Sequence, residues 1–159
     1  MKVIVMMGIP ASGKSTWIAE NLPYEEFPDV ISTDDLRKRL AGDESDQTHN
    51  TEVFGMAHAQ LRWLLLHGKN VVWDATNVTA HARNHIRNIC KEYEATTQLV
   101  IMSTPYEVCC ERNAARDRVV PIHAMERMED QFAEALGDLD PGLWDEITYV
   151  GQSYPINAA

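Results

Sequence analysis

The sequence predicts an α/β protein, a three-layer sandwich in which helices cover both faces of a parallel β-sheet. Two observations lead to this prediction. Short β-rich runs alternate with helical stretches along the 159 residues, which is the pattern of successive β–α–β units. In addition, residues 8–15 read G-I-P-A-S-G-K-S and lie between an apolar run and a helical stretch. Ligands of such sheets lie at the carboxyl ends of the strands, so the polar residues that follow each strand are the candidate site residues.

The expected elements alternate from the start of the chain. Strands are predicted at 3–7, 29–32, 71–73 and 99–103, with a last edge strand at 147–150. Helices are predicted at 15–22, 35–40, 50–67, 80–93, 105–115 and 122–136. Gly68 is the expected end of the long helix, and Pro105 and Pro121 each mark the start of a helix, because a helix tolerates proline best in its first turn.

Composition and charge limit the class of protein. A chain of 159 residues with 45% hydrophobic and 24% charged residues fits a single globular domain over residues 1–159. No apolar run is long enough to span a membrane. The three cysteines form no disulfide framework, which is typical of the reducing cytoplasm. The net charge of −10 argues against broad binding along a nucleic-acid backbone, but it does not exclude binding of a strand end in a small basic pocket.

Residues 8–15 match G-x-x-x-x-G-K-[ST], the phosphate-binding P-loop. Glycines let the backbone wrap round a phosphate chain with its N–H groups turned inward, and the start of the next helix adds its positive dipole end. Lys14 is expected to reach the β- and γ-phosphates, and the Ser15 hydroxyl to ligate Mg²⁺. A glycine-rich turn with a surface lysine would leave Ser15 and Thr16 unexplained. The predicted nucleotide-binding residues of this loop are Gly8, Ser12, Gly13, Lys14, Ser15 and Thr16.

The second predicted strand ends at Thr33-Asp34-Asp35. Two adjacent carboxylates there have three chemical uses: helix N-cap, contact with Mg²⁺, or general base. Phosphoryl transfer to a hydroxyl needs a carboxylate that accepts the proton, and Asp34 is the candidate base. Asp35 could instead simply cap the following helix. Arg37 lies on the same side of a helical turn as Asp34, where it could hold an anionic group of the acceptor or only pair with a carboxylate.

The third predicted strand, Val71-Val72-Trp73, ends at Asp74. An apolar strand that ends in aspartate is typical of a Walker-B element, which holds Mg²⁺ directly or through its waters. Asp74 is therefore a candidate metal ligand, and a role as second base stays open. Arg83 follows on the next helix, where it either reaches the site or is an ordinary solvated arginine.

A third cluster of charged residues reads E-R-N-A-A-R-D-R at 111–118. Arg112 and Arg116 are four residues apart and are expected on one helix face, and Pro121 then breaks the helix. A helix–break–helix with spaced arginines suits a lid, here residues 112–122, that closes over phosphates and stabilises the transferred group. Without the P-loop, a charged solvent face whose members pair locally would be the simpler interpretation.

Together these segments resemble the P-loop kinases that include the 5′-polynucleotide kinases, in particular the kinase domain of phage and bacterial end-healing enzymes. The resemblance covers nearly the whole chain in order, and its motifs are Gly8–Trp17, Asp34–Arg37, Asp74–Asn77, and Arg112-x3-Arg116 followed by Val120-Pro121. It implies a P-loop NTPase fold like that of nucleoside and adenylate kinases, with a helical lid. It also implies transfer of the γ-phosphate of ATP or GTP to the 5′-hydroxyl end of DNA or RNA, with Mg²⁺ as cofactor.

The resemblance gives each matched residue a role. Lys14, Asp34 and Arg116 would be catalytic, with Asp34 as the base for the acceptor hydroxyl and Arg116 stabilising the transferred phosphoryl group. Arg112 would bind the donor phosphates beside Arg116, and Arg37 would hold the phosphate next to the acceptor end. The expected acceptor-binding set is Asp34, Arg37, Gln47, Thr76, Asn77 and, from its place on the next helix, Arg83.

Three other functions share much of this pattern. A small-molecule kinase of the same fold would phosphorylate a nucleoside, sugar or antibiotic hydroxyl, and it is the main alternative. A regulatory NTPase would hydrolyse its nucleotide without an acceptor, and the Asp34–Arg37 pair and the arginine lid argue against it. A nucleoside monophosphate kinase has a phosphate acceptor that needs no carboxylate base. Neither the acceptor, nor the choice between ATP and GTP, nor the oligomeric state follows from the sequence.

Overall fold

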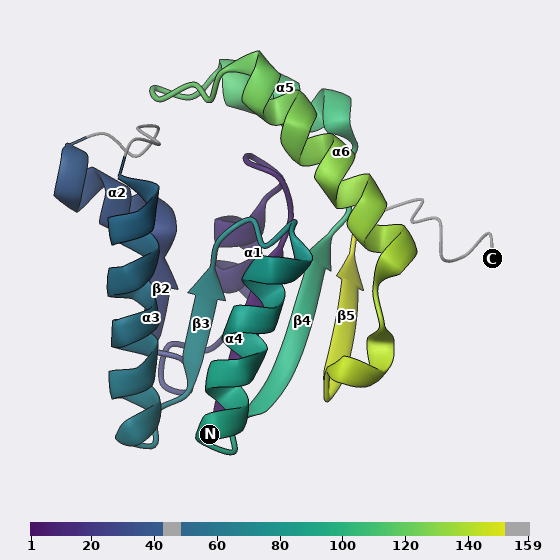
Figure 1. The fold of residues 1–159 in the computed structure, drawn as a ribbon. Helices are drawn as coiled ribbons and strands as arrows, with labels where there is room; N and C mark the ends of the chain where they lie inside the picture. The colour runs from purple at the N-terminus through teal and green to yellow at the C-terminus, as the bar shows by residue number, and fades with distance from the viewer. Residues whose placement is uncertain (43–48, 152–159) are drawn as a thin grey trace.

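The protein is built round a parallel sheet, as Figure 1 shows for the computed structural model, which describes residues 1–42 and 49–151. Within these residues the sheet has five strands in the order β2-β3-β1-β4-β5, and every neighbouring pair is parallel. The strands are β1 Lys2–Met7, β2 Asp29–Ser32, β3 Val71–Asp74, β4 Thr96–Met102 and β5 Glu146–Val150. The predicted α/β sandwich with a parallel sheet is confirmed.

Helices cover both faces of the sheet (Figure 1). In β1, Val3, Val5 and Met7 belong to a core on one face, whereas Ile4 and Met6 belong to a second core on the other. Consecutive strand residues point to opposite faces, so a strand that is apolar throughout must be covered twice. The helices are α1 Lys14–Asn21, α2 Thr33–Ala41, α3 Asn50–Leu66, α4 Ala80–Glu92, α5 Tyr106–Ala114 and α6 Ile122–Asp138, with a 3₁₀ helix at Pro141–Leu143.

The two cores assign the helices to their faces. The larger core contains side chains of α3, α4 and α6, among them Leu61, Ile86 and Phe132. The smaller core is covered by α1 through the partly buried Trp17 and Ile18. Each fully buried large apolar side chain contributes about 1.5–3 kcal/mol, so the sheet supplies a rigid support for the loops at its ends.

The structure extends β4 beyond its predicted start, from Leu99 back to Thr96. Thr97 and Gln98 are buried polar residues, which a search for apolar runs does not detect. Thr97 N–H donates to the carboxylate of Asp145 at 2.8 Å, and Gln98 Nε2 donates to Thr148 Oγ1 at 2.9 Å. Because these partners satisfy the polar groups, the strand can include them.

The start of α2 corrects one interpretation of the two aspartates. The helix begins at Thr33, and Ser32 is its N-cap, because Ser32 Oγ accepts a hydrogen bond from the N–H of Asp35 at 3.2 Å. The alternative in which Asp34 and Asp35 serve as caps is therefore wrong.

All strands run in the same direction, so their carboxyl ends share one edge of the sheet. The P-loop leaves β1 at this edge, and α5 and the start of α6 rise above it (Figure 1). Among the described residues, no helix is long and apolar enough to cross a membrane.

Candidate active site

The P-loop folds into a tight turn between β1 and α1. Ala11, with a φ of 64°, and Gly13, with a φ of 96°, have left-handed backbone conformations, which turn successive N–H groups to one side. At Gly8 the backbone lies close to neighbouring side chains, since a Cβ there would lie 2.6 Å from Ser12 Oγ and 3.0 Å from Met102 Cβ. The turn is therefore a concave backbone surface of the kind that binds phosphate oxygens.

Two hydrogen bonds fasten the P-loop to neighbouring strand ends. The N–H of Gly8 donates to the carbonyl of Thr76 at 2.9 Å, and Thr104 Oγ1 donates to the carbonyl of Ser12 at 2.6 Å. Ser12 Oγ itself is buried and has no hydrogen-bond partner within the described part of the chain. Because an unpaired buried hydroxyl costs stability, its presence in this turn is typical of a ligand site.

Lys14 lies at the centre of the site. Its ammonium donates to the carbonyls of Gly8 and Ile9, both at 3.0 Å. Burial lowers the pKa of Lys14, and the carboxylates of Asp74 and Asp34 act in the opposite direction. The side chain is thus a partly desolvated cation, which interacts more strongly with an anion than a solvated lysine does.

Asp74 stands at the carboxyl end of β3, next to α1. Ser15 Oγ donates to Asp74 Oδ2 at 3.3 Å. Burial raises the pKa of the Asp74 carboxyl, and the Lys14 ammonium opposes this shift. The structure therefore brings the two residues predicted to bind metal into contact, and their oxygens are the ligand type that Mg²⁺ prefers.

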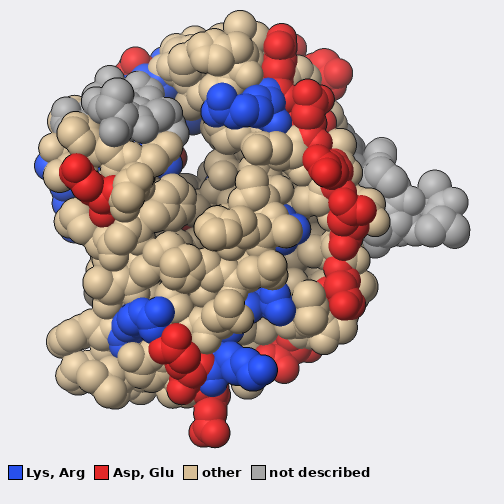
Figure 2. Space-filling model, viewed as in Figure 1, with Lys and Arg blue, Asp and Glu red and all other residues tan. Residues whose placement is uncertain are grey.

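Two adjoining cavities meet at these residues. The large cavity, of about 650 Å³, extends along the P-loop to the lid, and Trp17, Thr104 and Arg112 line it. The small cavity, of about 70 Å³, lies toward α2 and α3. Figure 2 shows the molecule hollowed between the lid and this side. Residues that line both cavities are Pro10, Lys14, Asp34, Asp74 and Arg116, and those that line only the small one include Thr33, Arg37, Phe54, Thr76, Arg118 and Met128.

Asp34 and Arg37 form a defined pair at the start of α2. Arg37 Nη1 donates to Asp34 Oδ1 at 2.6 Å, and Arg37 Nε donates to Asn50 Oδ1 at 2.9 Å. The Arg37 side chain is 9% exposed, whereas that of Asp34 is 52% exposed. The arginine therefore holds one oxygen of the carboxylate, and the other oxygen stays accessible to a ligand.

The lid segment, residues 112–122, is a helix–break–helix as predicted, with one correction. Because α5 ends at Ala114, Arg116 lies beyond the helix and does not share a helix face with Arg112. Both arginines nevertheless line the large cavity. Burial is the main cause of the lowered pKa of Lys14, and the charge of Arg116 acts in the same direction, so the break in the helix brings this charge near the P-loop.

Two predicted acceptor residues line neither cavity. Asn77 is buried, its Nδ2 donates to the carbonyl of Met6 at 2.6 Å, and its Oδ1 accepts from Trp73 Nε1 at 3.3 Å. Arg83 is also buried rather than solvated, and its Nη1 donates to the carbonyl of Asn77 at 2.9 Å. Both side chains support the loop after β3, and Arg83 lines a separate cavity between α4 and α6. Gln47 lies outside the described residues.

Some residues at the cavities were not selected from the sequence. Thr104 lies two residues after the end of β4, so its position near a strand end was a usable signal. Arg118 belongs to the lid cluster, and its spacing from Arg116 was visible. Phe54 lies on α3 among core residues, and no local pattern separates it from them.

The fold is that of a P-loop kinase-type protein, and the P-loop, Asp74, Arg112 and Arg116 line one cavity at the carboxyl ends of its strands. The chain belongs to the AAA domain family, whose model matches residues 3–135. Membership of this P-loop family implies nucleotide binding, and the P-loop and residues 112–122 both fall inside the matched range.

Solved structures share the fold at low sequence identity. A chain of the Pnkp1/Rnl/Hen1 RNA repair complex is 23% identical with a TM-score of 0.75, and the match covers 87% of this chain and 46% of that chain. A gluconokinase from Sinorhizobium meliloti 1021 is 20% identical with a TM-score of 0.60, over 99% and 86% of the two chains. Chaetomium thermophilum Kti12, in complex with ADP-AlF3, is 15% identical with a TM-score of 0.69, over 95% and 89%.

These likenesses establish the fold, and they include both a nucleic-acid repair complex and a small-molecule kinase. The chain spans just under half the length of the protein that it matches in the repair complex. The predicted resemblance to the polynucleotide kinase domain of repair enzymes is confirmed at the level of fold.

Proposed function

We propose that this protein transfers the γ-phosphate of a nucleoside triphosphate, ATP or GTP, to the 5′-hydroxyl end of DNA or RNA. The observation that carries the proposal is that Lys14, Asp34, Asp74 and Arg116 line both cavities. A phosphotransferase needs a donor compartment and an acceptor compartment with the transferred group between them. A regulatory NTPase needs only the first.

The large cavity would hold the triphosphate. The N–H groups of the P-loop and the unpaired Ser12 hydroxyl would bind phosphate oxygens, and Lys14 would bind the β- and γ-phosphates. Arg112, whose Nη1 lies 3.6 Å from the position of a Cβ at Gly13, would contact the same phosphate chain from the lid.

The donor oxygens of Ser15 and Asp74 fit a Mg²⁺ ion, because they lie 3.3 Å apart beside the phosphate-binding loop. When bound, Mg²⁺ neutralises charge on the β- and γ-phosphates. The ammonium of Lys14 favours the ionised form of Asp74, which is the form that binds a cation.

The acceptor hydroxyl would enter the small cavity and meet Asp34. As its oxygen bonds to the γ-phosphorus, the bond from phosphorus to the β–γ bridging oxygen breaks, and the hydroxyl proton passes to the accessible oxygen of Asp34. Arg37 orients this carboxylate through its 2.6 Å hydrogen bond to Oδ1. Arg116 would stabilise charge on the transferred group, because it lines both cavities.

The charge of the small cavity supports a phosphate-bearing acceptor. Arg37 and Arg118 both line this cavity, and Thr33 and Thr76 add hydroxyl groups. The 5′ end of a polynucleotide carries a phosphate one sugar away from its free hydroxyl, and arginine binds phosphate in a planar, two-point manner. The phosphate nearest to the 5′-hydroxyl is therefore the group that these side chains would bind, and contacts along a longer strand are not needed.

The test is transfer of labelled phosphate from ATP to an oligonucleotide with a 5′-hydroxyl, with Asp34→Asn beside the wild type. The amide keeps an acceptor for Arg37 but cannot take a proton, so kcat is expected to fall about 10²–10⁴-fold. Asp35→Asn is the matched comparison. Its kcat should fall less than tenfold, because Asp35 lines only the large cavity.

Either of two outcomes would change the proposal. Near-normal turnover of Asp34→Asn would exclude Asp34 as the base and leave Asp74 as the candidate. Intact ATP binding by the wild type, without any transfer to the oligonucleotide, would exclude the polynucleotide acceptor.

A small-molecule kinase is the second candidate, favoured by the size of the small cavity, about 70 Å³, and by the net charge of −10. Its acceptor would be a nucleoside, sugar or antibiotic hydroxyl. Arg37→Ala separates the two functions. This variant should abolish binding of a 5′-hydroxyl oligonucleotide if that is the acceptor. It should weaken binding of a neutral sugar acceptor much less.

A further inference from the structure

Asn113 is a buried polar residue that lines neither of the two cavities. It is the last but one residue of α5 and is 4% exposed. Its side chain bonds across the break in the lid segment: Nδ2 donates to the carbonyl of Val120 at 2.9 Å, and Oδ1 accepts from the N–H of Val120 at 3.0 Å. One side chain thus holds both backbone groups of a residue on the far side of the break.

This pair of hydrogen bonds closes the break into a short loop with both ends held. The N–H of Arg116 donates to the carbonyl of Asn113 at 3.1 Å, so Asn113 also holds the first turn of the loop through its backbone. Arg116 and Arg118 lie in this loop, and both line the small cavity. The position of the lid arginines therefore depends on a loop that Asn113 fastens.

The other end of α5 is fastened to the P-loop. Thr104, just before the helix, donates to the carbonyl of Ser12 at 2.6 Å. The helix is thus tied to the phosphate-binding turn at its start and to the far side of the break near its end. An arginine carried by such a support has fewer conformations to lose when the substrates bind.

We propose that Asn113 is a positioning residue for phosphoryl transfer: its side-chain amide holds the lid loop so that Arg116 is in place at the boundary of the two cavities before the substrates bind. The inference rests on the proposed function. Asparagine suits this role because its amide carries a donor and an acceptor, which match the carbonyl and the N–H of one residue. Aspartate can only accept, and alanine does neither.

The first experiment compares Asn113→Ala with the wild type in the transfer assay. We expect kcat to fall about 10- to 100-fold, because small misplacements of a charge-stabilising group have effects of this size. The KM for ATP should change less than about threefold, because the P-loop contacts remain. Asn113→Asp should lose activity to a similar degree, because its carboxylate faces the carbonyl of Val120.

The decisive measurement is a double-mutant cycle with Arg116→Ala. If Asn113 acts through Arg116, Asn113→Ala should have little further effect on kcat in the Arg116→Ala background. A purely structural role would lower activity by the same factor in both backgrounds. Additive effects, or an Asn113→Ala variant with unchanged kcat, would overturn the inference.

Hydrogen exchange at the Val120 amide gives a readout that does not depend on the acceptor. Its N–H is held by Asn113 Oδ1, so exchange should be faster in Asn113→Ala than in the wild type. Unchanged exchange would also overturn the inference. If the wild type transfers phosphate to a small molecule and not to an oligonucleotide, only the proposed acceptor fails, and the cycle is measured with that small molecule.

Asn70→Ala is the matched control. Asn70 also joins two backbone groups: Oδ1 accepts from the N–H of Lys2 at 2.8 Å, and Nδ2 donates to the carbonyl of Glu26 at 3.2 Å. It lies before β3, at the end of the sheet away from the cavities. The Asn70→Ala variant should be less stable, while its kcat stays within about twofold of the wild type. Substitutions far from a site act mainly on stability.

Discussion

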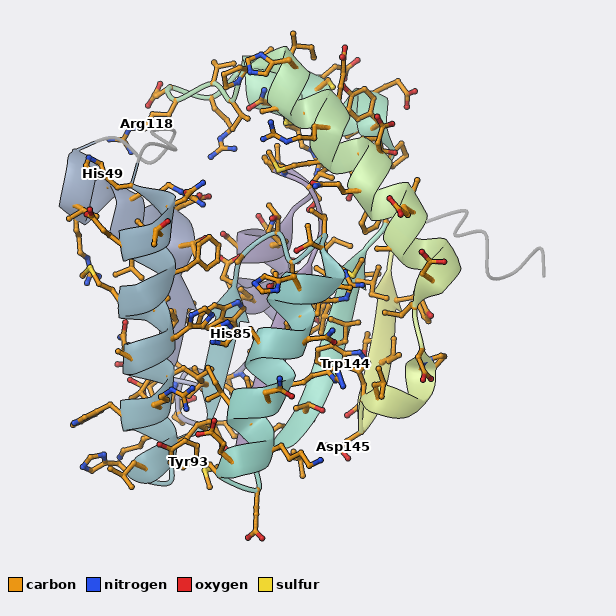
Figure 3. All side chains as sticks on the ribbon, viewed as in Figure 1. His49, His85, Tyr93, Arg118, Trp144 and Asp145 are labelled. Atoms are coloured by element: carbon orange, nitrogen blue, oxygen red, sulfur yellow. The ribbon has the colours of Figure 1, made fainter. Side chains whose placement is uncertain are left out.

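The buried polar groups at the two ends of the parallel sheet differ in how completely they are paired. At the amino end, the carboxylate of Asp145 accepts from both the N–H and the hydroxyl of Thr97, at 2.8 and 3.3 Å. At the carboxyl end, burial lowers the pKa of Lys14 and raises that of Asp74, and Ser12 Oγ has no partner among residues 1–42 and 49–151. Figure 3 shows Asp145 at one end of the molecule and Arg118 of the lid segment at the other.

The difference separates stabilising polar groups from functional ones. At the amino end, Asp145 accepts hydrogen bonds from groups of Thr97 that would otherwise be buried without a partner, and so it contributes to stability. The charged groups at the carboxyl end are partly desolvated, which costs free energy of folding. Their removal should therefore lower activity and change stability little. The predictions below test this contrast.

The largest effect is expected for Lys14→Met. The variant keeps most of the side-chain volume but removes the cation, so transfer should fall at least about 10²–10³-fold. The free energy of unfolding should be unchanged or higher, because a partly desolvated ammonium is lost. Steady-state kinetics and urea denaturation measure the two effects. The control is Lys2→Met, at an exposed pair with Glu146, which should change neither by much.

Gly8→Ala should impair both folding and nucleotide binding. The added Cβ would lie 2.6 Å from Ser12 Oγ and 3.0 Å from Met102 Cβ, and overpacking of this kind costs about 1–3 kcal/mol. Thermal unfolding and ATP titration would show the two losses. Gly55→Ala is the matched control on α3, where a Cβ meets no atom within 4 Å and should raise stability by up to about 1 kcal/mol. A stable Gly8→Ala variant with normal ATP affinity would contradict the close approach.

Asp145→Ala should have the reverse pattern to Lys14→Met. Thr97 is 7% exposed, and its N–H would lose its acceptor, which costs about 1–3 kcal/mol of stability. The kcat should stay the same, because the change lies at the end of the sheet away from both cavities. Asp145→Asn retains a carbonyl acceptor and should recover part of the stability. Loss of kcat in a folded Asp145→Ala protein would count against the contrast.

The smallest effect is expected at His58, which lies between the two ends. Its ring stacks on His85, with centroids 3.8 Å apart, and on Trp73, at 5.3 Å. Burial and then the nearby charge of His85 lower the pKa of His58 to about 4. The unfolded chain, with a pKa of about 6.5, therefore binds more protons between pH 6.5 and 4, and stability falls as the pH is lowered through this window.

After allowance for solvent screening of this half-buried ring, the loss should be roughly 1–2 kcal/mol between pH 7 and pH 4. Urea denaturation at several pH values measures it. His58→Phe keeps an aromatic ring without a titrating group, so its stability should depend less on pH in the same window. An equal pH dependence in both proteins would assign the effect to other groups.

Much of the site was accessible from the sequence because its signals are local. The P-loop spacing, the aspartates shortly after β2 and at the end of β3, and the proline before α6 can each be recognised within a few residues. Asn77 and Arg83 could not be placed in this way. Their side chains turn inward to support the loop after β3, and only the packing of that loop against β1 shows this.

Arg116 is a second residue whose position could not be predicted from local sequence patterns. Helix periodicity placed it on one face with Arg112, but α5 ends before it, and the Asn113–Val120 hydrogen bonds set its position instead. A hydrogen bond across seven residues of irregular chain leaves no periodic signal in the sequence.

The sequence by itself determined the α/β class, the P-loop and the strand-end aspartates, because strand alternation, glycine conformations and helix starts depend on neighbouring residues. Only the tertiary structure decided that Lys14, Asp34, Asp74 and Arg116 line both cavities. These residues lie after β1, after β2, at the end of β3 and in the break after α5, segments that are distant in the chain. The order β2-β3-β1 of the parallel sheet and the closed lid loop bring them together, and neither can be read from local patterns.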